Sequence, residues 1–586
     1  MATQAEHPHG EVAAIRDTVE SIWVAIVVAF VLRAFLIEAF VIPTGSMAPR
    51  LMGAHWQLRC RSCAYSYAFG LPKLRPGTDP RTVVNSAKCP NCNFPHNYAG
   101  ENLCRGDQVL VMKYLYHFTD PQPYDVVVFK NPQNNRENYI KRLIGLPGET
   151  IEIVHGDIFV KDRKAGQTEF RIRRKPPKAQ EAMWQVVFDN DYQPDESQHF
   201  SPDHRVPVPR WVPSEGSDKW QTANSGREFA FAGSEQPQAL TLEMVWKTSN
   251  PRVRETLEDA RRDMFLPHYG YNTRRSEMEE IDEDVDICTD LQLSAVYWPG
   301  DADSTLHLGL TSFDHEFRGE VSRDGTCRIL YRHAVQTENK WVQWGDAAKI
   351  PTMTAGRGYA VSLSHVDLRV ALRVNGREIL ARTDKTPLAN AQAVKLMGYE
   401  SLKAKIRMVR HHAEEIPLPR PSLAASGGPC RVNHLRLSRD VYYTTPDLRS
   451  VAAIEQDSKG RRQDRSAQLR YAAEEIEVEA GKPGWGTTGR PLELAYHEDR
   501  SRADLDEFFV VGDNSPQSLD GRGWIKAAPT LELYDQQGRP IYTLGTVPRY
   551  NILGKAFFVY WPAGFRFPGL PNLQILPNVG QMRLIR

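Results

Sequence analysis

Residues 22–49 read IWVAIVVAFVLRAFLIEAFVIPTGSMAP, an apolar segment that runs directly into a turn containing a serine. The apolar part, 22–42, has 21 residues; as a helix it would measure about 31 Å, close to the hydrocarbon thickness of a bilayer. Its charges, Arg33 and Glu38, lie in its second half, where long side chains can reach the headgroups. The sequence therefore predicts a transmembrane helix over 22–42 and disfavours a buried core helix or a cleaved signal peptide.

The residues before this segment say little about its orientation. Arg16 is the only lysine or arginine in 1–21, so the positive-inside rule has almost nothing to count. Charge alone leaves the topology open.

The composition is that of a folded protein of several domains. The chain has 586 residues, 41 % hydrophobic and 25 % charged, which excludes a wholly disordered, collagenous or polytopic membrane chain. The length corresponds to roughly four domains. The formal net charge is +1, so nothing in the charge balance favours nucleic acid as a partner.

Three short segments carry residues suited to hydrolytic chemistry. Residues 43–49, PTGSMAP, end the apolar segment with two prolines and a glycine and present Ser46. Residues 139–149, YIKRLIGLPGE, place Lys141 at the end of a strand-like run, and 508–524, FFVVGDNSPQSLDGRGW, join a strand to a polar turn. Taken singly, each has an ordinary alternative: a turn serine, a solvated Lys-Arg pair and a surface turn.

Together, in this order, these segments resemble bacterial type I signal peptidase, a membrane-bound serine protease that removes signal peptides from exported proteins. Two further segments match the strand boxes of this family, GDQVLVMKYLY (106–116) and YDVVVFKNP (124–132). The resemblance implies a mainly β catalytic domain and a single-pass protein of the bacterial cytoplasmic membrane, with its N-terminus in the cytosol. It also implies a shallow apolar cleft for substrates with small residues at the first and third positions before the cut.

The same resemblance assigns the reacting groups. Ser46 matches the nucleophile and Lys141 the general base, while the backbone N–H of Ser46 and the hydroxyl of Thr44 match the oxyanion site. A lysine acts as a base only when neutral, and we expect burial to lower its pKa from about 10.4 by disfavouring the charged form. No cofactor enters this chemistry.

Further positions match residues that support the site. Ser518 matches the residue that hydrogen-bonds the lysine and orients it, and Asp520 and Arg522 match an ion pair that braces the site. Two more supporting residues are Arg142, in the segment 139–149 (the lysine box), and Asp513, in the segment 508–524 (the last box).

Two positions depart from the pattern of the family. Arg50 stands where a small hydroxyl residue is usual after the proline, and Gly521 stands where serine is common beside the aspartate. Neither position carries a reacting group, so we expect them to alter the shape of the local loops.

Four of the eight cysteines form two C-x-x-C pairs inside an insertion over 55–102: Cys60, Cys63, Cys89 and Cys92. Four thiolates on two tight turns suit tetrahedral zinc, so the sequence predicts a zinc-ribbon-like insertion with a structural zinc. Two disulfides are the alternative, because an extracytoplasmic compartment can be oxidising. The remaining cysteines have no ligand spacing: Cys104, Cys288, Cys327 and Cys430.

A second insertion consists of short alternating segments. Over 240–443, apolar and polar residues alternate between Gly, Asp and Asn turns, as in LQLSAVYW (291–298), which predicts an antiparallel β-sandwich. It faintly resembles a concanavalin-like or laminin-G-like jelly roll. The predicted divisions are 1–21 cytosolic, 22–42 transmembrane, 43–189 catalytic, 190–443 sandwich, 444–502 a polar connector with a helical piece at 468–478, and 503–586 catalytic with a C-terminal loop.

The expected partners are preprotein signal peptides and the lipid bilayer, with an envelope or translocation partner on the sandwich. A different class of function remains open: an anchored envelope binding protein whose protease segments serve as scaffold while the sandwich binds a ligand. Arg50 and the size of the second insertion motivate this alternative.

Overall fold

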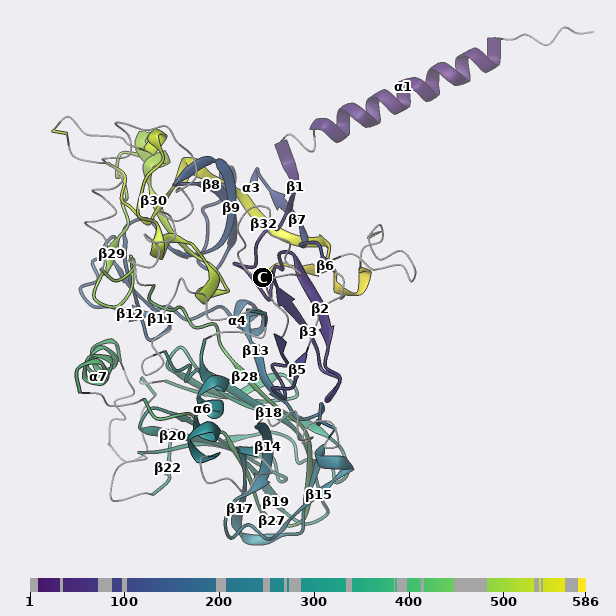
Figure 1. Cartoon of the computed structure of the whole chain (residues 1–586), viewed down its shortest axis with the longest axis vertical. Helices are drawn as coiled ribbons and strands as arrows, with labels where there is room; N and C mark the ends of the chain where they lie inside the picture. Colours follow the sequence, from purple (N-terminus) through teal and green to yellow (C-terminus); the bar gives the residue numbers. More distant parts are fainter. Residues whose placement is uncertain are drawn as a thin grey trace, which may run out of the picture.

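The computed structural model of the chain confirms the prediction of a mainly β protein. The structure describes residues 9–31, 35–71, 87–96, 103–195, 207–245, 253–267, 271–272, 286–333, 340–383, 385–386, 398–412, 416–446, 482–531, 537–538, 541–563 and 578–586. Figure 1 shows a core sheet beneath the projecting helix α1, with a larger body of strands at the opposite end.

The predicted helix over 22–42 is wrong from Ile37 onward. Helix α1 spans His9–Val31, and Ile37–Val41 form the strand β1. β1 pairs antiparallel with β7 (Gln108–Met112), from Ile37 against Met112 to Val41 against Gln108. The run IEAFV contains β-branched and aromatic residues that suit a strand, and β7 supplies partners for its backbone. Among the described residues, the structure has no helix that is both long enough and apolar enough to cross a membrane.

The core sheet combines both ends of the chain. Its order is β1-β7-β32-β8-β9-β30-β31, with β33 paired to β32. The C-terminal strand β32 therefore lies between two strands from the first quarter of the chain. The further strands are β8 (Val126–Asn131), β9 (Asn134–Gly145), β30 (Glu507–Val511), β31 (Val547–Pro548), β32 (Ile552–Trp561) and β33 (Arg583–Leu584).

Continuous apolar runs explain why β8 and β30 are buried within this sheet. Residues 126–129 of β8 are all buried, as are all five residues of β30. A run that is buried on both faces reads as uniformly hydrophobic and does not alternate.

The C-terminal loop that we predicted is partly wrong, because β33 adds a strand to this sheet. The short helix α3 (Leu115–Phe118) follows β7.

A smaller sheet continues from the core sheet, in the order β12-β11-β10-β29. Its hydrophobic cluster includes Val441 and Tyr443, which follow the last strand of the large body. The small sheet thus joins the two parts of the molecule. Its elements are β10 (Glu149–Val154), β11 (Asp157–Asp162), β12 (Arg171–Ile172) and β29 (Leu492–Glu493), with helix α4 (Pro177–Met183) after β12.

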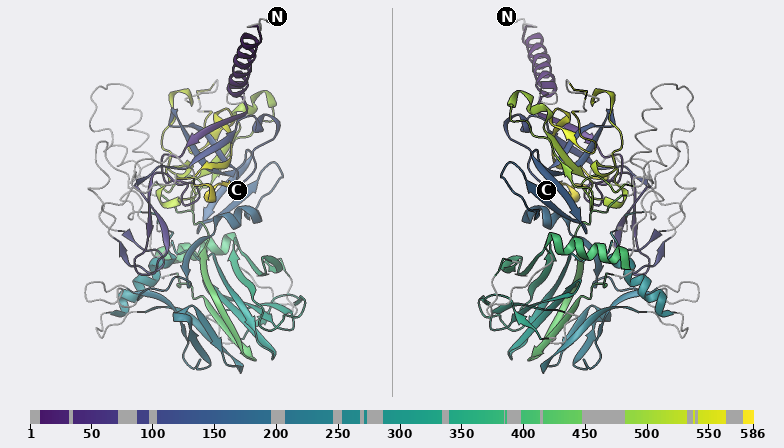
Figure 2. Two further views of the ribbon diagram at one scale, coloured as in Figure 1. Left: turned by 90° about the vertical axis from the view of Figure 1, so that its right-hand side faces the viewer. Right: turned by 90° about the vertical axis from the view of Figure 1, so that its left-hand side faces the viewer.

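The large body consists of two eight-stranded antiparallel sheets around the largest hydrophobic core (Figure 2). Along β18, side chains at alternate positions are buried, from Leu291 to Pro299, as the period of two along a strand requires. One sheet has the order β15-β16-β28-β18-β24-β25-β26 with β13 on β28, and the other β14-β17-β27-β19-β20-β21-β22 with β23 on β21.

The strands of the large body are β13 (Gln185–Asp189), β14 (Val208–Pro213), β15 (Trp220–Ala223), β16 (Glu228–Phe231), β17 (Ser234–Val245), β18 (Leu291–Pro299), β19 (Ser304–Ser312), β20 (His315–Ser322), β21 (Thr326–His333), β22 (Val342–Gln343), β23 (Ala348–Lys349), β24 (Tyr359–Val366), β25 (Arg369–Val374), β26 (Arg377–Arg382), β27 (Ser422–Gly427) and β28 (Cys430–Arg439). Its helices are α6 (Val253–Phe265) and α7 (Tyr399–His412).

The cysteine pairs lie in a small ribbon beside the core sheet. One sheet has the order β3-β2-β6, and β4 pairs with β5; Figure 1 shows β2, β3 and β5 between the core sheet and the large body. The strands are β2 (His55–Arg59), β3 (Ser66–Gly70), β4 (Ala87–Lys88), β5 (Pro95–His96) and β6 (Leu103–Cys104).

Most of the predicted polar connector over 444–502 lies outside the described residues. This includes the helical piece expected at 468–478. The described part, from residue 482, contains β29 and the 3₁₀ helix Arg500–Leu505.

Candidate active site

Ser46 meets Lys141 beside β9, an interior strand of the core sheet. Lys141 Nζ lies 2.7 Å from Ser46 Oγ, and the two residues are only 4 % and 8 % exposed. Ser46 follows β1 through the turn 43–49, while Lys141 lies in β9, where it pairs with Val127 of β8. An amine and a hydroxyl at this separation can exchange a proton, which is the geometry that a nucleophile and its base require.

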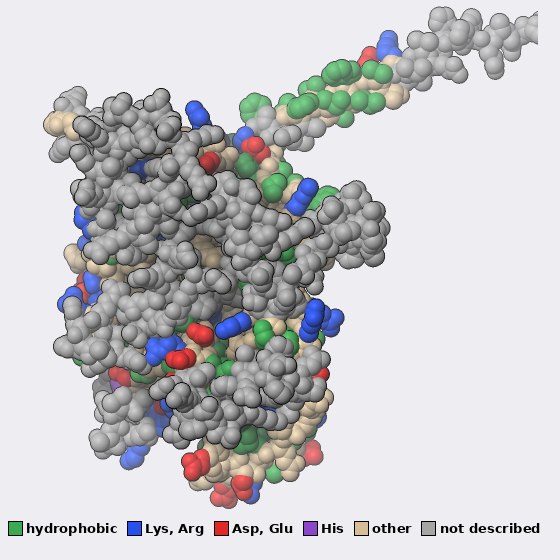
Figure 3. All heavy atoms as spheres, viewed as in Figure 1, with side chains coloured by type: hydrophobic (Ala, Val, Ile, Leu, Met, Phe, Trp, Pro, Cys, Tyr) green, Lys and Arg blue, Asp and Glu red, His purple; other side chains and the backbone are tan. Residues whose placement is uncertain are grey.

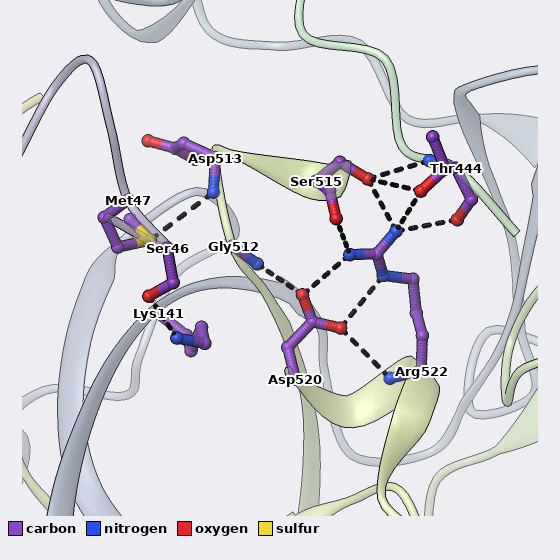
Figure 4. Close-up of polar contacts among 9 residues, drawn as sticks. All are labelled: Ser46, Met47, Lys141, Thr444, Gly512, Asp513, Ser515, Asp520 and Arg522. Atoms are coloured by element: carbon purple, nitrogen blue, oxygen red, sulfur yellow. Dashed lines mark hydrogen bonds and ion pairs between the residues drawn. The ribbon is translucent and has the colours of Figure 1, made fainter. Parts of the chain in front are cut away.

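The turn that carries Ser46 is held from the other end of the chain. The amide of Asn514 donates to the carbonyl of Ser46 at 3.0 Å, and its side-chain amide donates to the carbonyl of Gly45 at 2.9 Å. The amide of Asp513 lies 3.4 Å from Met47 Sδ (Figure 4). These contacts fix the serine turn against the segment that follows β30.

Glycine is required where β30 meets the serine turn. A Cβ added to Gly512 would lie 2.1 Å from Ser518 Oγ and 2.5 Å from the carbonyl oxygen of Ser46. No side chain fits in that space, so the backbone after β30 can approach Ser46 closely only with glycine at this position.

Asp520 and Arg522 form a buried two-pronged ion pair (Figure 4). Arg522 Nε and Nη2 donate to the two carboxylate oxygens at 2.9 and 2.8 Å. Its Nη1 donates to the carbonyl of Thr444 at 2.7 Å and to Ser515 Oγ at 2.6 Å. Burial by itself would raise the pKa of Asp520, but the charge and hydrogen bonds of Arg522 outweigh this effect, so the pKa is lowered. The pair therefore ties the last box to Thr444, which lies just beyond the large body.

Arg142 and Asp513 form a second buried pair directly beside the reacting groups. Arg142 Nε and Nη2 each donate to one carboxylate oxygen of Asp513 at 2.6 Å, and Nη1 donates to the carbonyl of Tyr124 at 2.9 Å. Burial opposes the charge of Arg142, but Asp513 outweighs it and raises the pKa of the guanidinium. Since Arg142 follows Lys141 and Asp513 precedes Asn514, this pair joins the lysine strand to the residue that holds the serine turn.

Ser518 lacks the contact that the sequence predicted for it, while Thr44 lies in the expected turn. Ser518 Oγ is buried without a hydrogen-bond partner among the described residues, so the predicted bond to Lys141 is not formed. Its side chain lies instead against the backbone of Gly512, within the space that a Cβ there would occupy. Thr44 is exposed in the serine turn, and its oxyanion role stays a prediction.

The two departures from the family pattern have local explanations. Arg50 is partly buried, and burial lowers its pKa to about 10 against an opposing effect of Asp513. It reaches the carbonyl of Glu181 in α4 at 3.5 Å. A Cβ on Gly521 would lie 2.6 Å from the carbonyl of Gly545, so the usual serine does not fit in this loop.

Two residues that no sequence motif indicated, Tyr271 and Asn272, approach the serine turn. Tyr271 packs on Ala48, so closely that a Cβ on Gly45 would lie 2.4 Å from its ring. The side chains of Asn272 and Asn514 exchange hydrogen bonds at 2.9 and 2.8 Å. Asn514 belongs to the segment 508–524, but its hydrogen bonds to the serine turn depend on a tertiary contact that the sequence does not indicate.

Clusters of metal-ligating residues lie away from this site. The four ribbon cysteines have their sulfur atoms within 4.8 Å of one another. A group of three carboxylates, Asp157, Asp290 and Asp367, is also compact, but Lys175 lies at its edge and donates to Asp367 at 2.6 Å. Lys175 already supplies the positive charge there. A third compact group, Asp314, His315 and His333, also has ligand atoms suited to a metal, and Lys405 forms an ion pair with its Asp314. Among these groups of the described residues, the cysteine cluster is the one whose members are all buried.

The family model that matches this chain is described as signal peptidase, peptidase S26. It covers residues 83–210 and 463–561. The matched segments contain Lys141 and the last box, including Asp520 and Arg522, whereas Ser46 lies before them.

Curated relatives include proteins named signal peptidase I from three Rickettsia species. The Rickettsia bellii protein is 24 % identical over 26 % of this chain and 42 % of its own length, and the Rickettsia typhi protein is 27 % identical over 26 % and 47 %. The Rickettsia prowazekii protein is 29 % identical over 25 % and 42 %. The chain thus spans less than half the length of these relatives.

Among solved structures, the chain is similar to a carbohydrate binding module, CBM66 from Bacillus subtilis, at 6 % identity over 39 % of this chain and 94 % of that one, with a TM-score of 0.21. The galectin LEC-6 from Caenorhabditis elegans is 14 % identical over 26 % of this chain and 82 % of its own, with a TM-score of 0.16. The β-glucanase of Bacillus licheniformis is 8 % identical over 40 % of this chain and 97 % of its own, with a TM-score of 0.20. No conclusion about this chain follows from TM-scores at this level.

Proposed function

Because the chain is related to the type I signal peptidases, we propose that it is a serine endopeptidase that removes signal peptides from exported preproteins. The observation that carries this proposal is the contact of 2.7 Å between Ser46 Oγ and Lys141 Nζ. In this mechanism Ser46 attacks the scissile carbonyl while the neutral amine of Lys141 accepts its proton. The same amine then donates a proton to the leaving nitrogen, and a water molecule hydrolyses the acyl-enzyme.

Burial of the two reacting groups supports these roles. Lys141 is 4 % exposed, and burial disfavours the charged form of an amine. The nearby acidic side chains are already paired, Asp520 with Arg522 and Asp513 with Arg142. Arg522 is the main partner of Asp520, although the charge of Lys141 also contributes to lowering the pKa of that carboxylate.

The oxyanion that forms during attack would be stabilised by the amide of Ser46 and the hydroxyl of Thr44. Loss of one such donor costs on the order of a hundredfold or more in rate. The buried hydroxyl of Ser518, against Gly512 beside the serine turn, would be the partner that receives Lys141 once it is protonated.

We further propose that α1 and the residues up to β1 hold the chain at a lipid bilayer, with the short N-terminus in the cytosol and the catalytic part outside. The part of α1 from Ile22 onward consists of apolar residues, and their exposed side chains include Trp23 at 62 %, Val24 at 63 % and Phe30 at 65 %. Figure 3 shows apolar side chains along this helix, which projects away from the body. Apolar surface of this extent is unfavourable in water and favourable in lipid.

The test of the catalytic proposal is cleavage of a preprotein that has small residues at the first and third positions before the cut. The purified full chain should cut it, and Ser46→Ala and Lys141→Ala should each abolish cleavage. Lys130→Ala is the matched control, because Lys130 is an exposed lysine on the neighbouring strand β8. Undiminished cleavage by either site variant would refute the dyad.

A folded wild-type chain that cuts no preprotein would instead favour the anchored binding protein considered above. The lipid proposal is tested separately by flotation with liposomes. Trp23→Glu combined with Val24→Glu should reduce flotation. Val579→Glu, which alters an apolar residue that is 69 % exposed elsewhere in the chain, should leave it unchanged.

A further inference from the structure

The four ribbon cysteines surround one point. Cys60 Sγ lies 3.6 Å from Cys92 Sγ, and Cys63 Sγ lies 3.7 Å from Cys89 Sγ. All four sulfur atoms are within 4.8 Å of one another, and the four residues are at most 4 % exposed. A disulfide requires about 2.05 Å between sulfur atoms, so none of these contacts is a disulfide.

The two C-x-x-C turns have the same backbone geometry, although they lie in different parts of the ribbon. In each turn, the amide of the residue after the second cysteine donates to the carbonyl of the first cysteine, at 3.0 Å for Cys60 and 2.8 Å for Cys89. That residue has a positive φ in both turns, 62° at Ala64 and 61° at Asn93. In each, the amide of the first cysteine donates to the carbonyl five residues further on, at 2.8 and 2.9 Å. Two equivalent turns therefore present their thiols to each other.

We propose that these cysteines bind one zinc ion as a closed, structural site of four thiolates. Zinc–sulfur bonds of about 2.3 Å in a tetrahedron place the sulfur atoms about 3.8 Å apart. This is close to the 3.6 and 3.7 Å that separate the sulfur atoms of Cys60 and Cys92 and of Cys63 and Cys89. Four protein ligands leave no position for water or substrate, so the ion takes no part in cleavage.

The zinc turns would fix the ribbon to the start of the large body. Asn91, inside the second turn, donates to the carbonyls of Asp189 and Tyr192 at 3.2 and 3.0 Å and accepts from the amide of Asp189 at 2.7 Å. From the first turn, the carbonyl of Ser62 accepts from the amide of Asp195 at 3.1 Å. Both turns thus hold the segment that leaves β13.

The other end of the ribbon touches the serine turn. β2 begins at His55, a few residues after Ser46, and its partner β3 ends at Gly70. The amide of Gly70 donates to the carbonyl of Tyr271 at 2.6 Å, and the ring of Tyr271 packs on Ala48. Zinc would therefore stabilise a connection that runs from the large body through the ribbon to the catalytic turn.

The proposal is tested by the zinc content of the full-length chain, measured by plasma mass spectrometry on protein purified without added metal or chelator. We expect one zinc per chain in the wild type and background levels in Cys92→Ser. The matched control is Cys430→Ser, since Cys430 is a buried cysteine outside the cluster. This variant should keep its zinc. X-ray absorption at the zinc edge of the wild type should show four sulfur neighbours at about 2.3 Å.

A wild-type chain that contains no zinc, with its four ribbon cysteines oxidised in intact-mass and thiol counts, would overturn the proposal. So would zinc whose neighbours are nitrogen or oxygen. Both measurements use the wild type, so they decide the matter even if Cys92→Ser fails to fold. Zinc content and cleavage are separate readouts, so failure of one proposal leaves the other standing.

Discussion

Replacing Arg522 by methionine is expected to lower the free energy of unfolding by about 3–5 kcal/mol, because it removes one partner of a buried ion pair. Arg522 and Asp520 are both 0 % exposed. The variant loses the two guanidinium hydrogen bonds to the carboxylate, at 2.9 and 2.8 Å, and the bonds to Thr444 and Ser515. The carboxylate keeps two backbone donors, the amide of Gly512 at 2.8 Å and the amide of residue 522 at 3.2 Å. These two neutral donors do not balance a buried charge.

The pH dependence of this loss provides an independent check. In the wild type the pKa of Asp520 is lowered, since Arg522 outweighs the effect of burial. Its contribution to stability is therefore fully present above the unfolded pKa of about 3.9 and is lost as the pH falls through the lower folded value. Without Arg522, burial raises the pKa, and the contribution is instead lost as the pH rises. The deficit of the variant should thus be largest near neutral pH and shrink towards pH 4.

The assay is urea unfolding followed by tryptophan fluorescence, at several pH values between 4 and 7. Lys349→Met is the matched control, because its ion pair with Asp324, at 2.7 Å, joins side chains that are 61 % and 49 % exposed. The control should cost less than about 1 kcal/mol. Arg522→Met combined with Asp520→Leu should recover part of the loss. A deficit no larger than that of the control, or one independent of pH, would refute this account of the pair.

Three further outcomes are expected. Asn514→Ala removes the side-chain hydrogen bond to the carbonyl of Gly45. This variant should lower kcat for preprotein cleavage by roughly tenfold to a hundredfold with little change in KM. A change confined to KM would contradict the role of Asn514 in holding the serine turn. Gly521→Ser restores the residue usual in the family but meets the carbonyl of Gly545, so thermal unfolding should show a loss of about 1–3 kcal/mol, and a gain would contradict the close approach. Burial raises the pKa of Asp440 to about 6, so its contribution to stability is present at pH 4 and is lost as the pH rises to 6. Asp440→Asn should remove this decrease from a plot of the free energy of unfolding against pH. An unchanged decrease in the variant would contradict the assignment to Asp440.

The strands were predictable wherever local pattern and burial agree. The alternation in 291–298 matches the alternating burial of β18, and the apolar runs of β8 and β30 match their burial on both faces. The segment 37–41 was misassigned because IEAFV continues an apolar helix as readily as it forms a strand. Its pairing with β7, about 70 residues further along the chain, decides the outcome, and a non-local contact leaves no local trace in sequence.

In the candidate site, too, the residues in recognisable segments were predictable and the contacts between distant segments were not. Ser46 and Lys141 were singled out by their sequence segments, and the structure places them in contact. The hydrogen bond between Asn272 and Asn514 joins residues that are 242 positions apart. Asn272 belongs to a segment with no recognisable motif, so this contact was not predictable. The sequence also identified Gly521 as a departure, but the reason, a carbonyl that leaves no room for a side chain, exists only in the folded loop.

The position of β32 bears on the life of the newly made chain. β32 lies between β7 and β8 in the core sheet, yet it is synthesised about 420 residues after β8, a delay of roughly 20–80 s at the usual pace of translation. Until β32 emerges from the ribosome, the two early strands lack the neighbour that separates them, and Asp520 and Arg522 have only just been made. β32 links the β1–β7 pair, which leads into Ser46, to the β8–β9 pair, which carries Lys141. A nascent chain without β32 therefore lacks the complete sheet that positions these two side chains.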